Sequence, residues 1–169
     1  MRRKRSPTHS AAQQPRPRRR VPDRAAAGNR GKRPDVARCP GCGASYREGR
    51  WTWRSAPADA YPQTCPACER AAARDPAGVV RVEGAFAAAH RDELIALVRS
   101  VEERERSDHP LKRVMRLQER KNGFVAETTD AKLARSLGRA LRKAYAGELE
   151  EPPTTAEEGS LVRVRWVRD

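Results

Sequence analysis

The sequence lacks several features that would place it in a common functional class. No apolar run is long enough to cross a membrane as a helix, and the basic segment Arg2–Arg5 is not followed by the apolar stretch of a signal peptide. The phosphate-binding patterns GxGxxG and GxxxxGK[ST] are absent, as is the metalloprotease pattern HExxH. We therefore expect no enzymatic activity, no small-molecule substrate and no membrane association, and we expect a cytoplasmic protein.

Cysteine is scarce, and its arrangement is the most specific signal in the chain. The four cysteines form two pairs, Cys39-x-x-Cys42 and Cys65-x-x-Cys68, with 22 residues between the pairs. Two such turns supply four thiolates to one tetrahedral ion, as in structural zinc ribbons, and leave no coordination position open for a substrate. An iron–sulfur cluster or redox-active pairs would use the same thiols. Because a thioredoxin-type redox pair should open a helix, whereas we expect turns here, we predict a Zn²⁺ site formed by all four cysteines.

The positive charge is concentrated at the N-terminus. The chain carries a formal net charge of +14, and residues 1–38 hold 13 Lys and Arg against two acids, so that +11 of the total lies there. This segment is also poor in branched aliphatic residues and cannot bury enough apolar surface to offset its chain entropy. We predict a disordered basic tail over residues 1–35, in which Arg18, Arg19 and Arg20 are candidate nucleic-acid contacts.

Residues 36–75 are expected to form the zinc ribbon, with a hairpin over residues 44–53 that turns at Glu48-Gly49. Trp51 and Trp53 are two residues apart and would share a face of a strand. They either shield the metal site and pack on the next domain, or provide a stacking platform for nucleotide bases. We favour packing, because the chain has only 5% aromatic residues, and keep both tryptophans as candidate nucleic-acid contacts.

Residues 76–169 show the alternation of elements typical of an α+β domain. The pattern predicts strands over 78–84, 111–120, 124–128 and 161–168, helices over 85–107 and 131–146, and a loop over 148–160. This order, βαββαβ, predicts a ferredoxin-like domain with a four-stranded antiparallel sheet and two helices on one face.

The second predicted helix has five basic residues and no acidic one between positions 131 and 147. A basic stripe of this kind is a candidate phosphate contact, although a merely solvated face is the alternative. The basic residues of the helix are Lys132, Arg135, Arg139, Arg142 and Lys143. Further basic residues fall on or near the predicted strands, where the sequence leaves their register open: Arg81, Lys112, Arg116, Arg163 and Arg165.

Six short motifs together resemble a family of small, uncharacterised bacterial zinc-ribbon proteins. They are Cys39-Pro-Gly-Cys42-Gly, Gly49-Arg-Trp-Thr-Trp53, Cys65-Pro-Ala-Cys68, His109-Pro-Leu, Thr128-Thr-Asp130 and Leu133-Ala-Arg135. Over about residues 39–75 the ribbon is also similar to the N-terminal zinc-binding region of the archaeal and eukaryotic large-ribosomal-subunit export adaptor. That adaptor carries more CxxC pairs than this chain, and its other domains are not recognisable here. The resemblance implies a role at the ribosome.

Taken together, these patterns predict a non-enzymatic, zinc-binding, RNA-binding protein that associates with ribosomal RNA or a ribosomal subunit. A zinc-ribbon adaptor that binds a protein partner or DNA in transcription is the alternative, since zinc ribbons serve in both settings. Charge alone does not separate RNA from DNA, because either polyanion releases counterions when basic side chains bind its phosphates.

Overall fold

The computed structural model describes residues 36–153 and 161–169, and the predicted tail with Arg18, Arg19 and Arg20 lies outside them. By its internal contacts, the segment Pro34–Asp169 forms one compact unit that contains two separate sheets. Among the described residues, no helix has both the length and the apolar character needed to span a bilayer.

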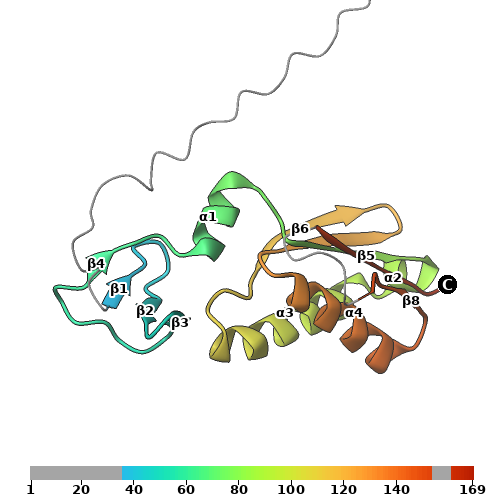
Figure 1. Ribbon diagram of the computed structural model, residues 1–169. Coiled ribbons are helices and arrows are strands. Elements are labelled where there is room, and N and C mark those ends of the chain that lie inside the picture. Colours follow the sequence, from blue (N-terminus) through green and yellow to red (C-terminus); the bar gives the residue numbers. More distant parts are fainter. Residues whose placement is uncertain (1–35, 154–160) are drawn as a thin grey trace, which may run out of the picture. The chain divides into compact units, whose positions relative to one another are not determined.

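The first sheet belongs to the cysteine-containing segment, and its strands are short. They are β1 (Val36–Arg38), β2 (Ser45–Arg47), β3 (Arg50–Thr52) and β4 (Tyr61–Pro62), in the order β3-β2-β1-β4 (Figure 1). The predicted hairpin turn is confirmed: Glu48 and Gly49 connect β2 to β3 with φ angles of 49° and 82°. Two consecutive positive φ values are what a two-residue hairpin turn requires, because its twist then matches that of the strands.

A short helix that was not predicted begins within the second cysteine pair. Helix α1 (Pro66–Ala73) has Cys65 as its N-cap and a proline at its first position, where the missing N–H costs nothing. It ends at Arg74, which adopts a left-handed conformation with φ 52°. The expectation of a simple turn after Cys65 was therefore wrong, because Pro66 starts this helix rather than preventing it.

The second sheet and three helices form the α+β part of the chain. Its elements are β5 (Gly78–Glu83), α2 (Ala85–Ala89), α3 (Arg91–Asp108), β6 (Val114–Arg120), β7 (Gly123–Thr128), α4 (Ala131–Tyr145), β8 (Glu148–Glu150) and β9 (Val162–Val167). The predicted helix over 85–107 is present but divided, since His90 separates α2 from α3. The mixed α+β class is confirmed.

The four-stranded antiparallel sheet of the ferredoxin-like prediction is not what the structure has. The sheet has five strands in the order β6-β7-β5-β9-β8, and β9 runs parallel to β5. The cause is β8, an edge strand placed within a predicted loop: it pairs antiparallel with β9 and so adds one reversal of chain direction. Its sequence is Glu-Leu-Glu, and acidic residues are depleted in strands, so the pattern gave no strand signal.

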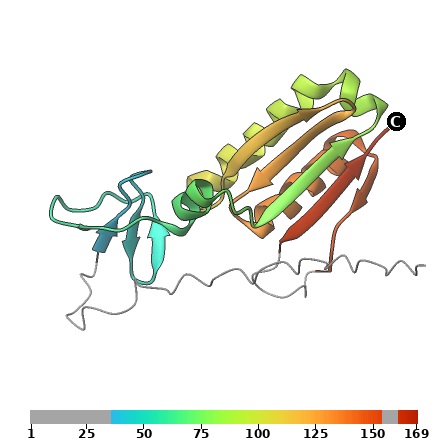
Figure 2. The same cartoon turned by 90° about the horizontal axis from the view of Figure 1, so that it is seen from above.

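All three helices cover one face of the five-stranded sheet, as Figure 2 shows. Along β5 and β9 the residues alternate between buried and exposed, so Val80, Val82, Val164 and Trp166 point toward the helices. The Trp166 indole is fully buried and donates its Nε1–H to the carbonyl of Ala146 at 2.8 Å. The other face of the sheet carries no helix in the described part of the chain.

Helix α4 lies close to the sheet because it has a glycine at the point of contact. A Cβ atom on Gly138 would lie 2.5 Å from Cγ1 of Val164 and 2.9 Å from Cδ1 of Leu149. These separations are far below van der Waals contact, so any larger side chain would push the helix away from β8 and β9.

We predict that Gly138→Ala lowers the free energy of unfolding by about 1–3 kcal/mol through overpacking, even though alanine is the better helix former by up to about 1 kcal/mol. Urea denaturation followed by circular dichroism measures the change. The same substitution should cost less in a Val164→Ala background, where the clashing methyl group is gone. Equal costs in the two backgrounds, or a more stable Gly138→Ala protein, would contradict this account.

Candidate metal centre

The two cysteine pairs come from two different local structures. Cys39 follows β1 and begins a tight turn in which its N–H bonds the carbonyl of Ala44 and its carbonyl accepts from Gly43, each at 2.8 Å. Gly43 has a φ of 79°, a conformation that glycine adopts without strain. In the second pair, the sulfur of Cys65 accepts from the N–H of Cys68 at 3.4 Å in the first turn of α1.

The turn and the helix start bring all four sulfur atoms together. The four Sγ atoms lie within 4.8 Å of one another, and those of Cys42 and Cys65 are 3.7 Å apart. A tetrahedral ion with metal–sulfur bonds of about 2.3 Å needs sulfurs roughly 3.8 Å apart. The donor set therefore fits a four-thiolate metal site, and with four protein ligands no position remains for a substrate.

Gly41 contributes to this geometry by leaving room next to the cluster. A Cβ atom at this position would lie 3.2 Å from the sulfur of Cys68 and 3.8 Å from that of Cys39. A side chain here would crowd the sulfurs, so the close approach of the two halves depends on a small residue between Cys39 and Cys42.

The surroundings of the sulfurs act on their pKa values in opposite directions. Burial of Cys39 favours its neutral thiol, but N–H donors of Cys65, Cys42 and Gly41 outweigh burial and lower its pKa to about 6. Burial raises the pKa of Cys65 to about 12 and also raises that of Cys68. Without an ion, Cys65 and Cys68 therefore keep their protons more strongly than Cys39 does. A bound cation would displace the protons on Cys65 and Cys68.

A residue far away in the sequence completes the cluster. Arg113, which precedes β6 in the α+β part, points its guanidinium at three of the four sulfurs: Nη1 is 3.4 Å from Cys68, and Nη2 is 3.2 Å from Cys42 and 3.3 Å from Cys65. Burial alone would lower the pKa of Arg113, but the hydrogen bonds and charges of Cys68 and Cys42 outweigh it and raise that pKa. The guanidinium stays positively charged beside the sulfurs.

Hydrogen bonds from both the backbone and the side chain of Arg113 hold its guanidinium in position. Its N–H bonds the hydroxyl of Thr129 at 2.9 Å, and its own Nε donates to the carbonyl of Pro110 at 2.8 Å. The Thr129 hydroxyl in turn donates to the carbonyl of Leu111 at 2.6 Å. A divalent ion with four thiolates carries a net charge of −2, and this anchored cation offsets part of it in a partly buried place.

Sequence reasoning missed Arg113, and the chain offers little that would have revealed it. The residue lies 45 positions beyond Cys68. The segment between Pro110 and Val114 contains two basic residues before a strand, and no motif in it indicates a contact with the cysteines. Its role follows from tertiary placement alone.

Both predicted tryptophans of the ribbon take part in packing. Trp51 on β3 packs against the cysteine cluster, and its ring centroid lies 5.5 Å from that of Tyr46. Trp53 follows β3 and donates its Nε1–H to the carbonyl of Arg106 in α3 at 2.6 Å. Residue Trp53 is 38% exposed, and Tyr61 of β4 is 57% exposed.

The basic residues of α4 occupy different environments. Arg135 is buried and donates from Nη2 to the carbonyl of Pro153 at 3.1 Å, and Arg139 pairs with Glu151 at 3.0 Å. The remaining three, Lys132, Arg142 and Lys143, are exposed. Lys132 lies in the first turn and the other two lie in the last turn, so the exposed charge is split between the ends of the helix.

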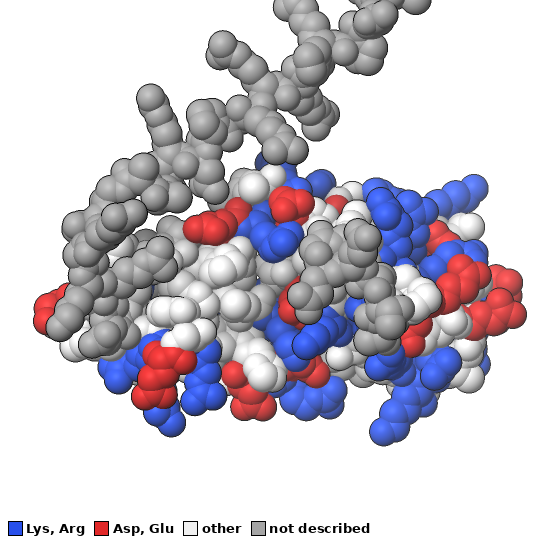
Figure 3. All heavy atoms as spheres, in the orientation of Figure 1, with Lys and Arg blue, Asp and Glu red and all other residues white. Residues whose placement is uncertain are grey.

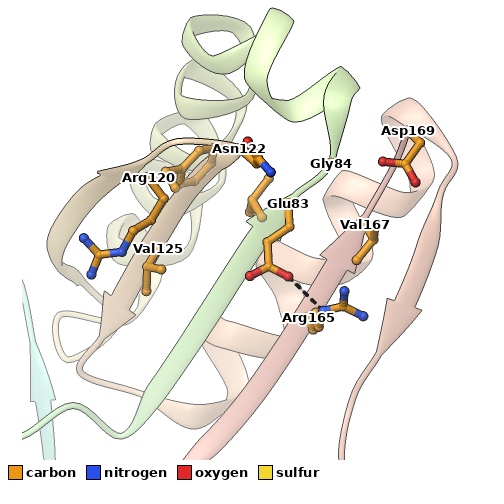
Figure 4. A pocket seen from close by; sticks show the side chains of 10 residues that line it. Glu83, Gly84, Arg120, Asn122, Val125, Arg165, Val167 and Asp169 are labelled. Carbon is orange, nitrogen blue, oxygen red and sulfur yellow. Dashed lines mark hydrogen bonds and ion pairs between the residues drawn. The ribbon is translucent and has the colours of Figure 1, made fainter.

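A hollow with a volume of about 440 Å³ lies at one end of the five-stranded sheet (Figure 4). Its titratable side chains are Glu83, Arg120, Arg165 and Asp169, and Glu83 is paired with Arg165 at 2.8 Å. No cysteine, histidine or lysine lines this hollow.

Comparisons with protein-family models, with curated proteins and with solved structures find no match to this chain. The fold and the cluster define an α+β protein with a four-cysteine centre that is suited to binding a metal ion.

We predict that Arg113→Gln weakens metal binding by about 10–100-fold, the effect usual for the loss of a charged partner in the second coordination shell. Competition with a chromophoric chelator measures the affinity of the purified full-length protein. Arg116→Gln, which removes the same charge from an exposed position three residues away, is the matched control and should bind metal as the wild type does. Equal losses in the two variants would show that overall charge, and not the contact with sulfur, is responsible.

We also predict that metal binding at pH 7.5 releases about two protons or more per ion. Cys65 and Cys68 have raised pKa values and hold their protons at this pH, whereas the lowered pKa of Cys39 leaves it already ionised. Titration calorimetry in buffers of different ionisation enthalpy counts the released protons. Metal affinity should fall as the pH drops, because protons compete for the same sulfurs; binding without proton release would contradict these pKa directions.

Proposed function

We propose that the four cysteines hold one structural Zn²⁺ and that the protein is a non-enzymatic, cytoplasmic RNA-binding factor that associates with the ribosome. The observation that carries the zinc assignment is the distance between the sulfurs. All four lie within 4.8 Å of one another, which suits coordination of a single ion. A four-iron cluster would hold its sulfurs around a core of several atoms, and thus further apart.

The ion completes a part of the chain that has little apolar core of its own. Among the described residues around the cysteines, the buried apolar cluster consists of Cys39, Cys65 and Ala67, with Trp51 and Leu111 partly buried against it. A core of this size does not hold four short strands together, so binding of the ion supplies folding free energy in such small domains. This supports a structural role for the metal.

RNA as the partner is supported by the charge of the chain. The chain has a formal net charge of +14, most of it in residues 1–38, and a strongly basic segment binds polyanions through release of their counterions. The ribosomal assignment also draws on the resemblance of the CxxC region to the large-subunit export adaptor.

We predict that purified protein contains one zinc ion per chain and that, in cell lysate, the full-length protein sediments with ribosomal particles at low salt and leaves them at high salt. Sucrose-gradient sedimentation at two salt concentrations, with detection by antibody, tests the second part. Elemental analysis tests the first.

A protein that stays at the top of the gradient at low salt would contradict the ribosomal role. In that case, binding of RNA and binding of duplex DNA are compared at matched salt. Preference for DNA, or binding of a protein partner without binding of either nucleic acid, would point to the adaptor alternative. A metal-free preparation with full secondary structure would overturn the structural role of zinc.

A further inference from the structure

The uncovered face of the five-stranded sheet collects basic residues from three strands. In β5 and β9 the buried residues alternate with exposed ones, which places Arg81, Arg163 and Arg165 on the face opposite the helices. Arg116 of β6 is opposite Glu127 of β7, and Glu127 is opposite Val79 of β5. Val79 is two residues before Arg81 on β5 and so faces the same side of the sheet, which places Arg116 on that side as well. The register that the sequence left open thus brings four of the five basic strand residues together.

Two of the acidic residues of this face are paired at one end of it, and Glu127, which lies beside Arg116, accepts a hydrogen bond from Gln118 at 3.2 Å. Arg165 pairs with both Glu83 and Glu150, at 2.8 and 3.2 Å. Among the described residues, Arg81, Arg116 and Arg163 have no carboxylate within ion-pair distance. We call these three the arginine face. In Figure 3, Lys and Arg side chains, with acidic side chains beside them, lie at the upper right of the molecule over the β6–β7 hairpin.

Apolar surface lies between these arginines, and a hollow extends the face toward α1. Val79 and Val125 are only partly buried on this side of the sheet. A hollow of about 320 Å³ is lined by Ala71 and Arg74 at the end of α1, by Met115 and Arg116 of β6, and by one carboxylate, that of Glu127. A ligand on this face would thus meet guanidinium groups and apolar surface side by side, and both suit an RNA strand: guanidinium binds phosphate and stacks on bases, and valine packs against sugar and base.

The α4 residues do not form a comparable surface. Arg135 is buried and Arg139 is neutralised by Glu151, so the exposed cations are left near the two ends of a 15-residue helix, about 15 Å apart along its axis. Arg142 and Lys143 in the last turn also have a structural reason for being basic, because cations stabilise the negative end of the helix dipole.

We infer that the arginine face is the surface that binds RNA, and that it takes a single strand. This inference rests on the proposed function. A single strand is favoured by width: five strands span roughly 19 Å, more than the major groove of about 12 Å that admits a two-stranded ribbon in duplex DNA. A flexible single strand can lie along the sheet and place successive phosphates near Arg163, Arg81 and Arg116.

Two full-length variants with the same loss of charge test this surface. The first carries Arg81→Gln, Arg116→Gln and Arg163→Gln, and the second carries Lys132→Gln, Arg142→Gln and Lys143→Gln on α4. Binding of a fluorescently labelled oligouridine is measured by anisotropy over a range of salt concentrations, with thermal unfolding as the check of folding. We expect the sheet variant to bind at least 10-fold more weakly than the α4 variant. The magnitude of its log–log salt slope should be lower than that of the wild type by about 2, since three phosphate contacts are lost.

The outcomes separate this inference from the proposed function. Equal weakening in both variants would overturn the arginine face and leave RNA binding in place. No oligouridine binding by the wild type would overturn the proposed function itself. Equal wild-type affinity for oligodeoxythymidine would keep the surface and reject RNA as its specific partner. If the triple sheet variant unfolds early, Arg163→Gln against Arg142→Gln gives the same comparison with single exposed residues.

Discussion

The Arg113 guanidinium lies against the sulfurs of Cys42, Cys65 and Cys68, and the segment that positions it belongs to the larger sheet. The cluster therefore does two things at once. It closes the ribbon on itself through the four cysteines, and it ties the ribbon to the α+β part through a charged contact. Because the ribbon has so few buried apolar residues of its own, polar and ionic interactions replace the hydrophobic core that a larger domain would use. The Trp53 hydrogen bond to Arg106 is a second link between the same two parts.

Local patterns in the sequence were sufficient for much of the fold. The turn at Glu48-Gly49, the strands around Lys121-Asn122 and the amphipathic helix ending before Gly147 depend on neighbouring residues, and they were correctly predicted. The features that were missed depend on tertiary context. Residues 148–150 form strand β8 because they pair with β9 and because Leu149 packs against the core. The reversal of the chain between β8 and β9 then sets the direction of β9. Helix α1 depends on Cys65 acting as a cap. The clustering of the four cysteines was predictable from their spacing, and Arg113 was not, because no local pattern marks a residue whose contact lies 45 positions away.

The basic residues illustrate why composition is a weak guide to a binding surface. On α4, a stripe with no acidic residue suggested a phosphate contact, yet Arg135 is buried and Arg139 meets Glu151, which comes from the segment after β8. On the sheet, arginines from distant segments share one face only because of the strand register. The electrostatic potential at a surface depends on which cations are already paired with acidic side chains, and the sequence alone does not give these pairs. The cysteine cluster did not present this difficulty, because residue type and spacing together identify candidate metal ligands.

The distribution of the three tryptophans has a practical consequence. Trp51 borders the cysteine cluster, Trp53 lies where the ribbon meets α3, and Trp166 is enclosed in the core of the sheet and helices. Each indole thus reports on a different part of the molecule: its emission would shift when that part becomes hydrated. Proteins that retain one tryptophan each would resolve ion release, opening of the junction and global melting as separate optical signals, without any attached dye.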